Sequence, residues 1–278
     1  AESYCTGLMA SASRASWQYV SRLYRSLRDA TRHRQLSAPT DGQRYPVPEE
    51  LLPLESDSGQ SLVMDGAVNQ SLVSVLLRQD HPAFCAVASA MTIARAENAG
   101  PFDQKKFMTV FREGGRHGAA WPNVMATYGL DALDGLPAPV KYWLLCHLQY
   151  DGAPMALLAE WFRLLGFSVD VVSSSAATEE TFRADVAAAF PQTGVCGSGR
   201  NYILVNYSRS AVGQRMFSGG HYAPLGGFHH TQDKVLLLEV NSWRYPSVWV
   251  DLPRLWGATH TQVANGSWRG YLRIRTAE

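Results

Sequence analysis

A run of small and apolar residues predicts a buried helix in the first half of the chain. Pro82 disfavours helix in the residue before it and suits the entry of the next element, so we expect the helix to begin near Cys85. No charge interrupts the run until Arg95, and apolar side chains recur at helical spacings. The recurring residues are Ala86, Val87, Ala90, Met91, Ile93 and Ala94.

Most helical patterns lie in the earlier part of the chain, and most strand patterns lie in the later part. Further helices are predicted over residues 66–79, 103–113, 140–150, 154–167 and 181–190, the last with Thr178 as its N-cap. Strands are predicted over residues 168–172 and 201–208, twice within 217–252 around a polar turn at 229–233, and just after Arg269. This order is typical of an α+β domain.

The first 60 residues have a pattern of their own. Residues 7–36 predict one basic amphipathic helix with an apolar face and many arginines around it, and residues 37–60 predict an extended, proline-rich linker. We therefore divide the chain into residues 1–60 and a main domain over residues 61–278. The basic helix is expected to dock on the domain, with a membrane surface or a partner as the alternative.

Composition excludes several classes of partner. The 278 residues carry a net charge of +1, which indicates neither nucleic acid nor an acidic polymer. The four cysteines and eight histidines show no zinc-like spacing, and the adjacent His229 and His230 lie in a predicted turn, so no metal site is predicted. No run approaches the roughly 20 apolar residues of a membrane span.

Cys85 is the first candidate for chemistry. A thiol at a helix N-terminus lies against unpaired backbone N–H groups and the positive pole of the helix dipole, which favours the nucleophilic thiolate. Six residues upstream, the side-chain amide of Gln79 could join the Cys85 N–H in stabilising an oxyanion. A free Cys in such a helix is more commonly just a small buried apolar residue, so a partner base is needed to favour catalysis.

His221 is the candidate base, at the start of a predicted strand that follows Gly219 and Gly220. The next strand ends in Glu239 and Asn241, which are two positions apart and are therefore expected on one face. If the two strands are antiparallel, either residue can reach the imidazole. A thiol, an imidazole and an orienting amide or carboxylate form a generalised catalytic triad.

Two segments carry a family resemblance. Residues 79–85 read QDHPAFC, where the family has a Gln-x5-Cys segment containing Pro-Ala-Tyr-Cys, and residues 220–228 read GHYAPLGGF against Gly-His-Phe-Ser-Pro-Ile-Gly-Gly-Tyr. Weaker similarity extends over roughly residues 60–275. The chain resembles the catalytic domain of phytochelatin synthase, a relative of the papain-like cysteine peptidases. The resemblance implies a papain-like α+β fold, with the nucleophile Cys on a helical part packed against an antiparallel sheet that carries the His.

The resemblance also assigns roles to single residues. It places the catalytic His at His221 and the family's catalytic Asp at Glu239, while the Arg that follows in the family is replaced by Ser242. Asn241-Ser242-Trp243 is similar to the Asn-Ser-Trp of papain itself, and we favour Asn241 slightly as the orienting residue, with Glu239 as the alternative.

Three residues are expected to bind substrate. Arg269 stands where the family has an Arg that resembles a clamp for a substrate carboxylate, and a guanidinium fork suits the α-carboxylate of a γ-glutamyl group. Arg209 is a second candidate clamp, and Gly220 gives the backbone room to approach a ligand. Either arginine could equally be a surface salt-bridge partner.

The implied activity is thiol-dependent acyl transfer on glutathione or a related γ-glutamyl-Cys peptide. Cys85 would cleave the Cys–Gly bond through a thioester, followed by hydrolysis or by transfer to another glutathione to give short phytochelatins. Plant-type members have an additional Cys-rich C-terminal region and this chain ends at Glu278, so we expect the short, prokaryotic-like form, in which hydrolysis dominates. No cofactor bound by the protein is expected, and cadmium or zinc would enter as a metal thiolate of the substrate.

Two other functions remain alternatives. One is an amidase, peptidase or acyltransferase with the same nucleophile and another peptide or conjugate as substrate. The other is a binding module without catalysis, against which the presence of Cys85, His221 and Gln79 argues. A homodimer is left open, and the sequence indicates no choice between cytoplasm and periplasm.

Overall fold

The computed structural model describes residues 44–80, 84–99, 104, 153–192, 200–217, 219–263 and 266–276. All of them belong to one compact unit formed by residues 43–124 and 152–278. The helices predicted over residues 7–36 and 140–150 lie outside the described residues, as does the helix predicted over 103–113 except for Gln104.

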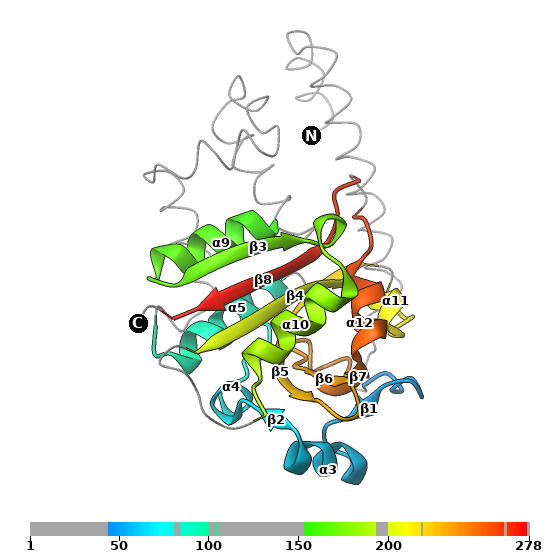
Figure 1. Cartoon of the computed structure of the whole chain (residues 1–278). Helices are drawn as coiled ribbons and strands as arrows, with labels where there is room; N and C mark the ends of the chain where they lie inside the picture. The colour runs from blue at the N-terminus through cyan, green and yellow to red at the C-terminus, as the bar shows by residue number, and fades with distance from the viewer. Residues whose placement is uncertain are drawn as a thin grey trace. The chain divides into compact units, whose positions relative to one another are not determined.

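An antiparallel sheet runs through the described unit in the order β1-β7-β6-β5-β4-β8-β3, and β2 pairs with β5 beside this path (Figure 1). The strands are β1 (Leu52–Pro53), β2 (Ala67–Val68), β3 (Ser168–Ser173), β4 (Asn201–Ser208), β5 (Gly220–His229), β6 (Lys234–Leu237), β7 (Val248–Asp251) and β8 (Gly270–Arg275). With its helices, the sheet makes the described unit an α+β structure.

The helices lie on both faces of the sheet (Figure 1). They are α3 (Asp57–Asp65), α4 (Gln70–Ser74), α5 (Cys85–Ala96), α9 (Met155–Leu164), α10 (Glu179–Ala189), α11 (Arg209–Val212) and α12 (Leu252–Thr259), with a 3-10 turn at Ser174–Ala176. Side chains alternate across β4 as the pleat requires: Tyr202 and Leu204 pack in the core with α5 and α9, and Ile203 and Val205 pack in the core with α10 and α12.

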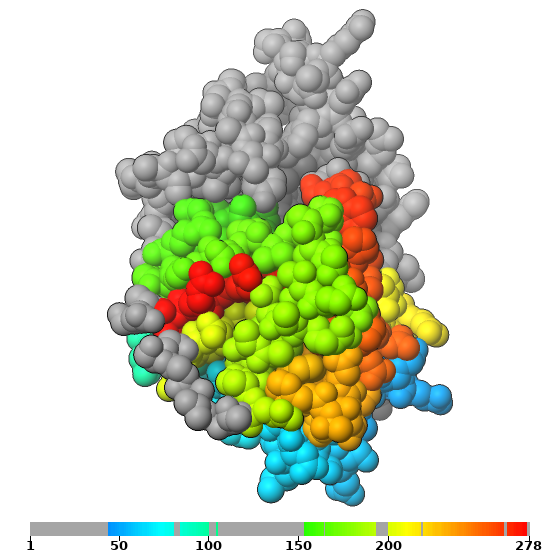
Figure 2. All heavy atoms as spheres, viewed as in Figure 1, coloured from blue at the N-terminus to red at the C-terminus, as the bar shows by residue number. Residues whose placement is uncertain are grey.

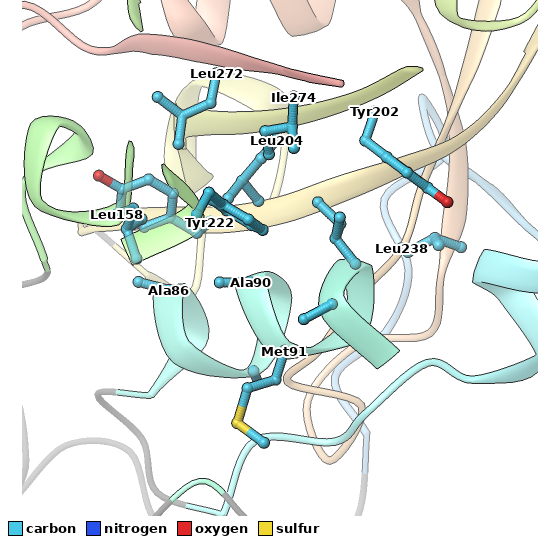
Figure 3. Packing of buried hydrophobic residues seen from close by; sticks show 14 of the residues in the cluster. Ala86, Ala90, Met91, Leu158, Tyr202, Leu204, Tyr222, Leu238, Leu272 and Ile274 are labelled. Atoms are coloured by element: carbon cyan, nitrogen blue, oxygen red, sulfur yellow. The ribbon is translucent and has the colours of Figure 1, made fainter. Parts of the chain in front are cut away.

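Helix α5 packs closely on the sheet because its facing side chains are small. Ala86 and Ala90 point toward Tyr222 of β5, whereas Met91 points away from the sheet (Figure 3). The Ser89 hydroxyl donates a hydrogen bond of 3.0 Å to the backbone oxygen of Tyr222. This bond ties the helix that begins with Cys85 to the strand that carries His221.

Aromatic side chains fill the core on the opposite face, where α10 and α12 lie in front of the sheet (Figure 2). Phe182 stacks on Trp256 with ring centroids 5.6 Å apart and meets Tyr271 edge-on at 4.9 Å. With α5 and α9 on the other face, the sheet is buried on both sides, which explains the continuous apolar runs of its central strands.

Several predicted elements are confirmed. Helix α5 begins at Cys85, and α9 and β3 occupy the segments predicted for them. The Thr178 hydroxyl caps α10 by accepting from Thr181 N–H. The register of β5 against β6 shifts between Leu225 and Gly227, at a glycine pair in the sequence.

Two predictions differ from the structure. The helix predicted over residues 66–79 is wrong for most of that range: β2 pairs with β5 first, and the Asn69 side chain then caps the short helix α4. Residues 37–60 are not an extended linker where they are described. Leu52 and Pro53 pair with β7, and Ser56 caps α3. Within the described residues, no helix is both long and apolar enough to cross a membrane.

Candidate active site

Cys85 is the first residue of α5, and the side chain of the N-cap residue, Phe84, makes no capping hydrogen bond to this end of the helix. The first-turn N–H groups of a helix have no partners within the helix, so the dipole favours negative charge on the Cys85 sulfur. The thiol is nearly fully buried, at 7% exposure. A buried thiol at a helix N-terminus is in a suitable place to become a thiolate.

His221 lies on β5 and Glu239 lies two residues beyond the end of β6. The Nε2 atom of His221 is 2.6 Å from Oε1 of Glu239, and both side chains are almost completely buried. A hydrogen bond also joins the side chains of Cys85 and His221. Because Nε2 faces Glu239, Nδ1 is the ring nitrogen left for the sulfur. The three residues form a chain from sulfur through imidazole to carboxylate.

Three further donors surround the Glu239 carboxylate. Its Oε1 atom accepts from the backbone N–H of Asn241 at 2.6 Å, and Oε2 accepts from Arg209 Nη2 at 2.6 Å and more weakly from Gln214 Nε2 at 3.5 Å. A buried charge is costly unless it is paired and hydrogen-bonded. Here the carboxylate has both kinds of compensation, so it is held ionised in one orientation.

The Nη2 atom of Arg209 also lies 3.1 Å from His221 Nε2. Nε2 cannot accept this contact while it donates its proton to Glu239, and the Glu239 contact is shorter. We therefore assign the Nε2–H donor to the carboxylate. The guanidinium then acts on the imidazole as a nearby charge, without a hydrogen bond.

The electrostatics of the site favour an ion pair. Burial opposes ionisation of the Cys85 thiol, but His221, a backbone hydrogen bond from Tyr222 and the charge of Arg209 together lower its pKa below the usual value of 9.0. Burial and Arg209 oppose protonation of His221, yet Glu239 and Cys85 raise its pKa above 6.5. Despite its burial, the pKa of Glu239 is lowered to about 2 by Arg209 and His221. Thiolate and imidazolium are thus favoured together.

Gln79 lies at the end of an irregular segment that follows α4, and residues 81–83 between it and α5 lie outside the described residues. Its side chain is 1% exposed. The Gln79 N–H donates to the backbone oxygen of Val240 at 2.9 Å, and the Trp243 indole donates to the Gln79 oxygen at 3.2 Å. The segment of Gln79 is therefore attached to the chain that follows Glu239.

Arg269 is buried just before β8, at 8% exposure. Its Nε donates to the Thr261 hydroxyl at 3.0 Å and its Nη1 to Oδ1 of Asn206 at 3.3 Å. No carboxylate of the described residues forms an ion pair with it, and burial lowers its pKa. A Cβ atom on Gly220 would lie 2.3 Å from Arg269 Nη1, so the guanidinium lies directly over the residue before His221.

The placement of two predicted residues differs from expectation. Arg209 lies inside the polar cluster of His221 and Glu239 and is paired there, whereas we had considered it as a clamp for substrate. Asn241, which we favoured slightly as the orienting residue, reaches the cluster through its backbone N–H, and the carboxylate of Glu239 contacts the imidazole. The physical reason is that β6 ends at Leu237, so the strand alternation assumed for both residues does not apply.

Residues that sequence reasoning missed also contribute to the site. Gln214 contacts Glu239, but no motif in the sequence marks it as part of the site. Gln104 hydrogen-bonds the chain on both sides of Gln79, and no pattern in the sequence marks it. Among the described residues, no group of three or more His, Cys, Asp and Glu side chains could hold a metal ion. His230 instead contacts the Phe190 oxygen, and His229 accepts from the Gln232 N–H.

Comparison with known proteins adds a family to this geometry. The model of the family described as phytochelatin synthase matches residues 42–271. The chain is 28% identical over 204 residues to glutathione gamma-glutamylcysteinyltransferase 3 of Lotus japonicus, a match that covers 73% of this chain and 36% of that protein. It is 23% identical over 236 residues to the glutathione gamma-glutamylcysteinyltransferase of Schizosaccharomyces pombe, covering 82% and 50%.

A third relative is glutathione gamma-glutamylcysteinyltransferase 1 of Triticum aestivum, 26% identical over 223 residues, with 80% of this chain and 38% of the relative covered. The chain thus spans between about a third and a half of the length of these relatives. The family model, in contrast, covers most of this chain, including Cys85, His221 and Glu239. The chain belongs to the phytochelatin synthase family.

Proposed function

We propose that the protein transfers the γ-glutamyl-Cys group of glutathione through a thioester on Cys85, within a papain-like arrangement of helix and sheet. The relatives are named for γ-glutamylcysteinyl transfer on glutathione. The single observation that carries the proposal is the buried chain from Cys85 through His221 to Glu239, at the start of α5. This chain supplies a nucleophile, a proton donor and an orienting acceptor.

In the first step, the Cys85 thiolate attacks the carbonyl carbon of the Cys–Gly bond. The carbonyl oxygen takes the negative charge, and the Cys85 N–H and the Gln79 side-chain amide are the donors we assign to it. His221, as imidazolium, gives its proton to the glycine nitrogen as the C–N bond breaks. Glycine leaves, and the γ-glutamyl-Cys group remains on sulfur as a thioester.

In the second step, neutral His221 removes a proton from the acceptor while the acceptor attacks the thioester. Water gives γ-glutamyl-Cys, and the amine of a second glutathione gives a longer peptide by dipeptidyl transfer. Either acceptor restores the Cys85 thiolate and the imidazolium. Cadmium or zinc would take part as the metal thiolate of a glutathione substrate.

Glu239 is the residue that we propose to orient His221. Its carboxylate accepts from Nε2, which directs Nδ1 toward sulfur and stabilises the charged imidazolium. Asn241 supports this arrangement through its backbone N–H. In this assignment the longer Glu side chain performs the task that the family gives to Asp.

Arg269 is proposed to bind the α-carboxylate of the γ-glutamyl group. Its described partners are a hydroxyl and an amide oxygen, which hold the fork in place without neutralising it. A desolvated guanidinium favours a carboxylate strongly, with two parallel hydrogen bonds where the geometry permits. Gly220 keeps the space beneath this fork free of a side chain.

The test is mass spectrometry of the protein after brief mixing with glutathione, with and without cadmium or zinc. We expect free glycine and a γ-glutamyl-Cys adduct on Cys85, both absent in Cys85→Ala. Product lengths then separate hydrolysis from transfer. A folded protein whose Cys85 remains reactive toward alkylating agents, but which gives neither glycine nor adduct, would refute glutathione as the substrate.

At Glu239 and Ser242 the chain departs from the family pattern, and these departures favour one alternative function. An amidase, peptidase or acyltransferase with another peptide or conjugate as substrate would use the same Cys85 and His221 chemistry. It predicts that Cys85 is alkylated rapidly while glutathione is not cleaved. The same experiment therefore distinguishes the two functions.

A further inference from the structure

The segment of residues 78–80 has no regular secondary structure, yet all four backbone polar groups of its two peptide links are hydrogen-bonded. Two of the contacts are the bonds from Gln79 N–H to Val240 and from Trp243 to the Gln79 oxygen. The other two both come from Gln104. A short irregular segment held at every polar group is fixed far more firmly than its lack of secondary structure suggests.

Gln104 reaches both sides of Gln79 with one side-chain amide. Its Nε2 donates to the Arg78 oxygen at 2.7 Å, and its Oε1 accepts from the Asp80 N–H at 3.0 Å. The two contacted groups belong to the peptide links on either side of Gln79. Gln104 is 5% exposed, so these bonds compete little with water.

We propose that Gln104 is a positioning residue for the oxyanion site: it fixes the 78–80 segment so that the Gln79 side chain meets the developing oxyanion. The proposal rests on the oxyanion role given to Gln79 in the proposed function. Gln104 touches neither substrate nor the reacting atoms and acts through the backbone on both sides of Gln79. Both bonds come from one rigid, planar amide group.

The contribution is expected to be large because oxyanion donors work by being held in place before charge develops. Loss of one such donor lowers turnover by about 10²- to 10³-fold. A displacement of about 1 Å at a catalytic group can cost about 10²-fold. Other contacts to the segment, from Thr92 to the Leu77 N–H and from Val240 and Trp243, limit the displacement but leave the Arg78 oxygen and the Asp80 N–H without partners.

Hydrogen exchange tests the positioning directly. Gln104→Met keeps the length of the side chain and removes both hydrogen bonds. We expect faster exchange in the peptide that contains the Gln79 and Asp80 amides, with unchanged exchange in α5 and in β5. The control is Gln60→Met, because Gln60 also donates its amide to a backbone oxygen, that of Leu54, at 2.7 Å, away from the site. Unchanged exchange around Asp80 in a folded Gln104→Met protein would overturn the proposal, whatever the substrate is.

A double-mutant cycle tests the catalytic consequence. Rates of glycine release are compared for the wild type, Gln79→Ala, Gln104→Met and the double variant, beside the rate of Cys85 alkylation by iodoacetamide. Alkylation displaces iodide from carbon and forms no oxyanion, so it reports the thiolate alone. We expect Gln104→Met to lower glycine release by about 10- to 10²-fold at unchanged alkylation, and to add little further loss on top of Gln79→Ala.

Failures of the two proposals look different. If the wild type releases no glycine, or Gln79→Ala leaves release unchanged, the proposed function fails at its substrate or at its oxyanion donor. If Gln79→Ala is slow and Gln104→Met multiplies that loss, or lowers alkylation in parallel, the positioning role of Gln104 is wrong.

Discussion

Arg209 and Arg269 are both buried beside the strand that carries His221, but their partners differ. Arg209 is 3% exposed and bonded to the carboxylate of Glu239, and its guanidinium lies over the Phe217 ring at 4.5 Å. Arg269 is 8% exposed and its described partners are the neutral side chains of Thr261 and Asn206. The sequence makes both of them candidates for binding a substrate carboxylate.

The difference shows that the partner of a buried charge decides what it can do. Arg209 already has a carboxylate, so its charge is used inside the protein, where it holds Glu239 ionised and favours the Cys85 thiolate. Arg269 has hydrogen bonds that orient it but no counter-charge among the described residues, and burial lowers its pKa. A carboxylate arriving from outside would relieve that cost.

Neutralising the carboxylate that distinguishes the two arginines should have the largest effect. In the native protein, the two carboxylate oxygens of Glu239 accept from four donors. Glu239→Gln leaves a single amide oxygen as acceptor, so His221 loses its fixed orientation and the charge of Arg209 is no longer neutralised. We expect turnover to fall by about 10²- to 10⁴-fold. Steady-state kinetics would measure it, with Asn241→Ala as the comparison. A loss in Asn241→Ala as large as in Glu239→Gln would mean that Asn241 orients the imidazole.

Removing Arg209 should damage the fold, because it leaves the buried Glu239 carboxylate without its cation. Breaking a buried ion pair from one side typically costs about 3–5 kcal/mol of unfolding free energy. Urea unfolding of Arg209→Met should show a loss of this size. Arg44→Met, which removes an exposed pair with Glu55, should change stability by only about 0.5 kcal/mol. Equal losses in the two variants would contradict the internal role of Arg209.

The pH dependence of Cys85 alkylation should separate the two arginines. The lowered pKa of Cys85 means that the alkylation rate rises with pH from below the usual range of a thiol. Because the charge of Arg209 helps to lower that pKa, Arg209→Met should move the rise to higher pH. Arg269→Met should leave it in place, since Arg269 is not among the groups that shift the Cys85 pKa. If the pH profile of alkylation moves in both variants, the two arginines do not differ in their effect on Cys85.

Arg269→Met should act on substrate binding with little effect on the fold. The loss of charge-assisted hydrogen bonds to the α-carboxylate should raise KM for glutathione by about 10- to 10²-fold. The matched control is a glutathione analogue with that carboxylate amidated. It should be a poor substrate for the wild type and no worse for the variant. If the variant still discriminates between the two substrates, Arg269 does not bind the carboxylate.

Gly220→Ala should give a smaller version of the same effect. The new methyl group would lie 2.3 Å from Arg269 Nη1, so the guanidinium must move while keeping its charge. We expect KM for glutathione to rise by about a few-fold, up to the smallest rise expected for Arg269→Met. Gly219→Ala is the control, because a Cβ there meets nothing within 4 Å. Identical kinetics in both variants would place substrate away from Arg269.

The sequence predicted the elements whose pattern is local. The start of α5 followed from Pro82 and the small residues after it, and the Thr178 cap followed from its helix. The helix predicted over residues 66–79 failed because the pairing of β2 with Phe228 and Gly227 is a long-range contact that no local pattern shows. Tertiary pairing overrode a helical pattern there.

The same distinction applies to the site. Cys85, His221 and Glu239 stand in recognisable motifs, whereas the role of Arg209 depends on which carboxylate lies beside it after folding. The role of Gln104 is even harder to predict, because a single Gln in a polar context belongs to no periodic pattern or motif. The slight preference for Asn241 came from its similarity to the Asn-Ser-Trp of papain. The expectation that Glu239 and Asn241 share one face assumed a strand that continues past Leu237, and strand ends are set by tertiary contacts such as the hydrogen bond from the Glu239 N–H to Ser247.

The hydrogen bond between Ser89 and Tyr222 has a consequence for folding kinetics. It joins residues 133 positions apart, close to Cys85 and His221, so these two side chains can meet only after a very long loop has closed. Contacts of such sequence separation form slowly, whereas α5 can form locally. In the unfolded chain Cys85 has an ordinary thiol. During refolding, rapid alkylation of Cys85 at mildly acidic pH should therefore appear late, after helix formation. The alkylation rate of Cys85 would then report when the fold is complete.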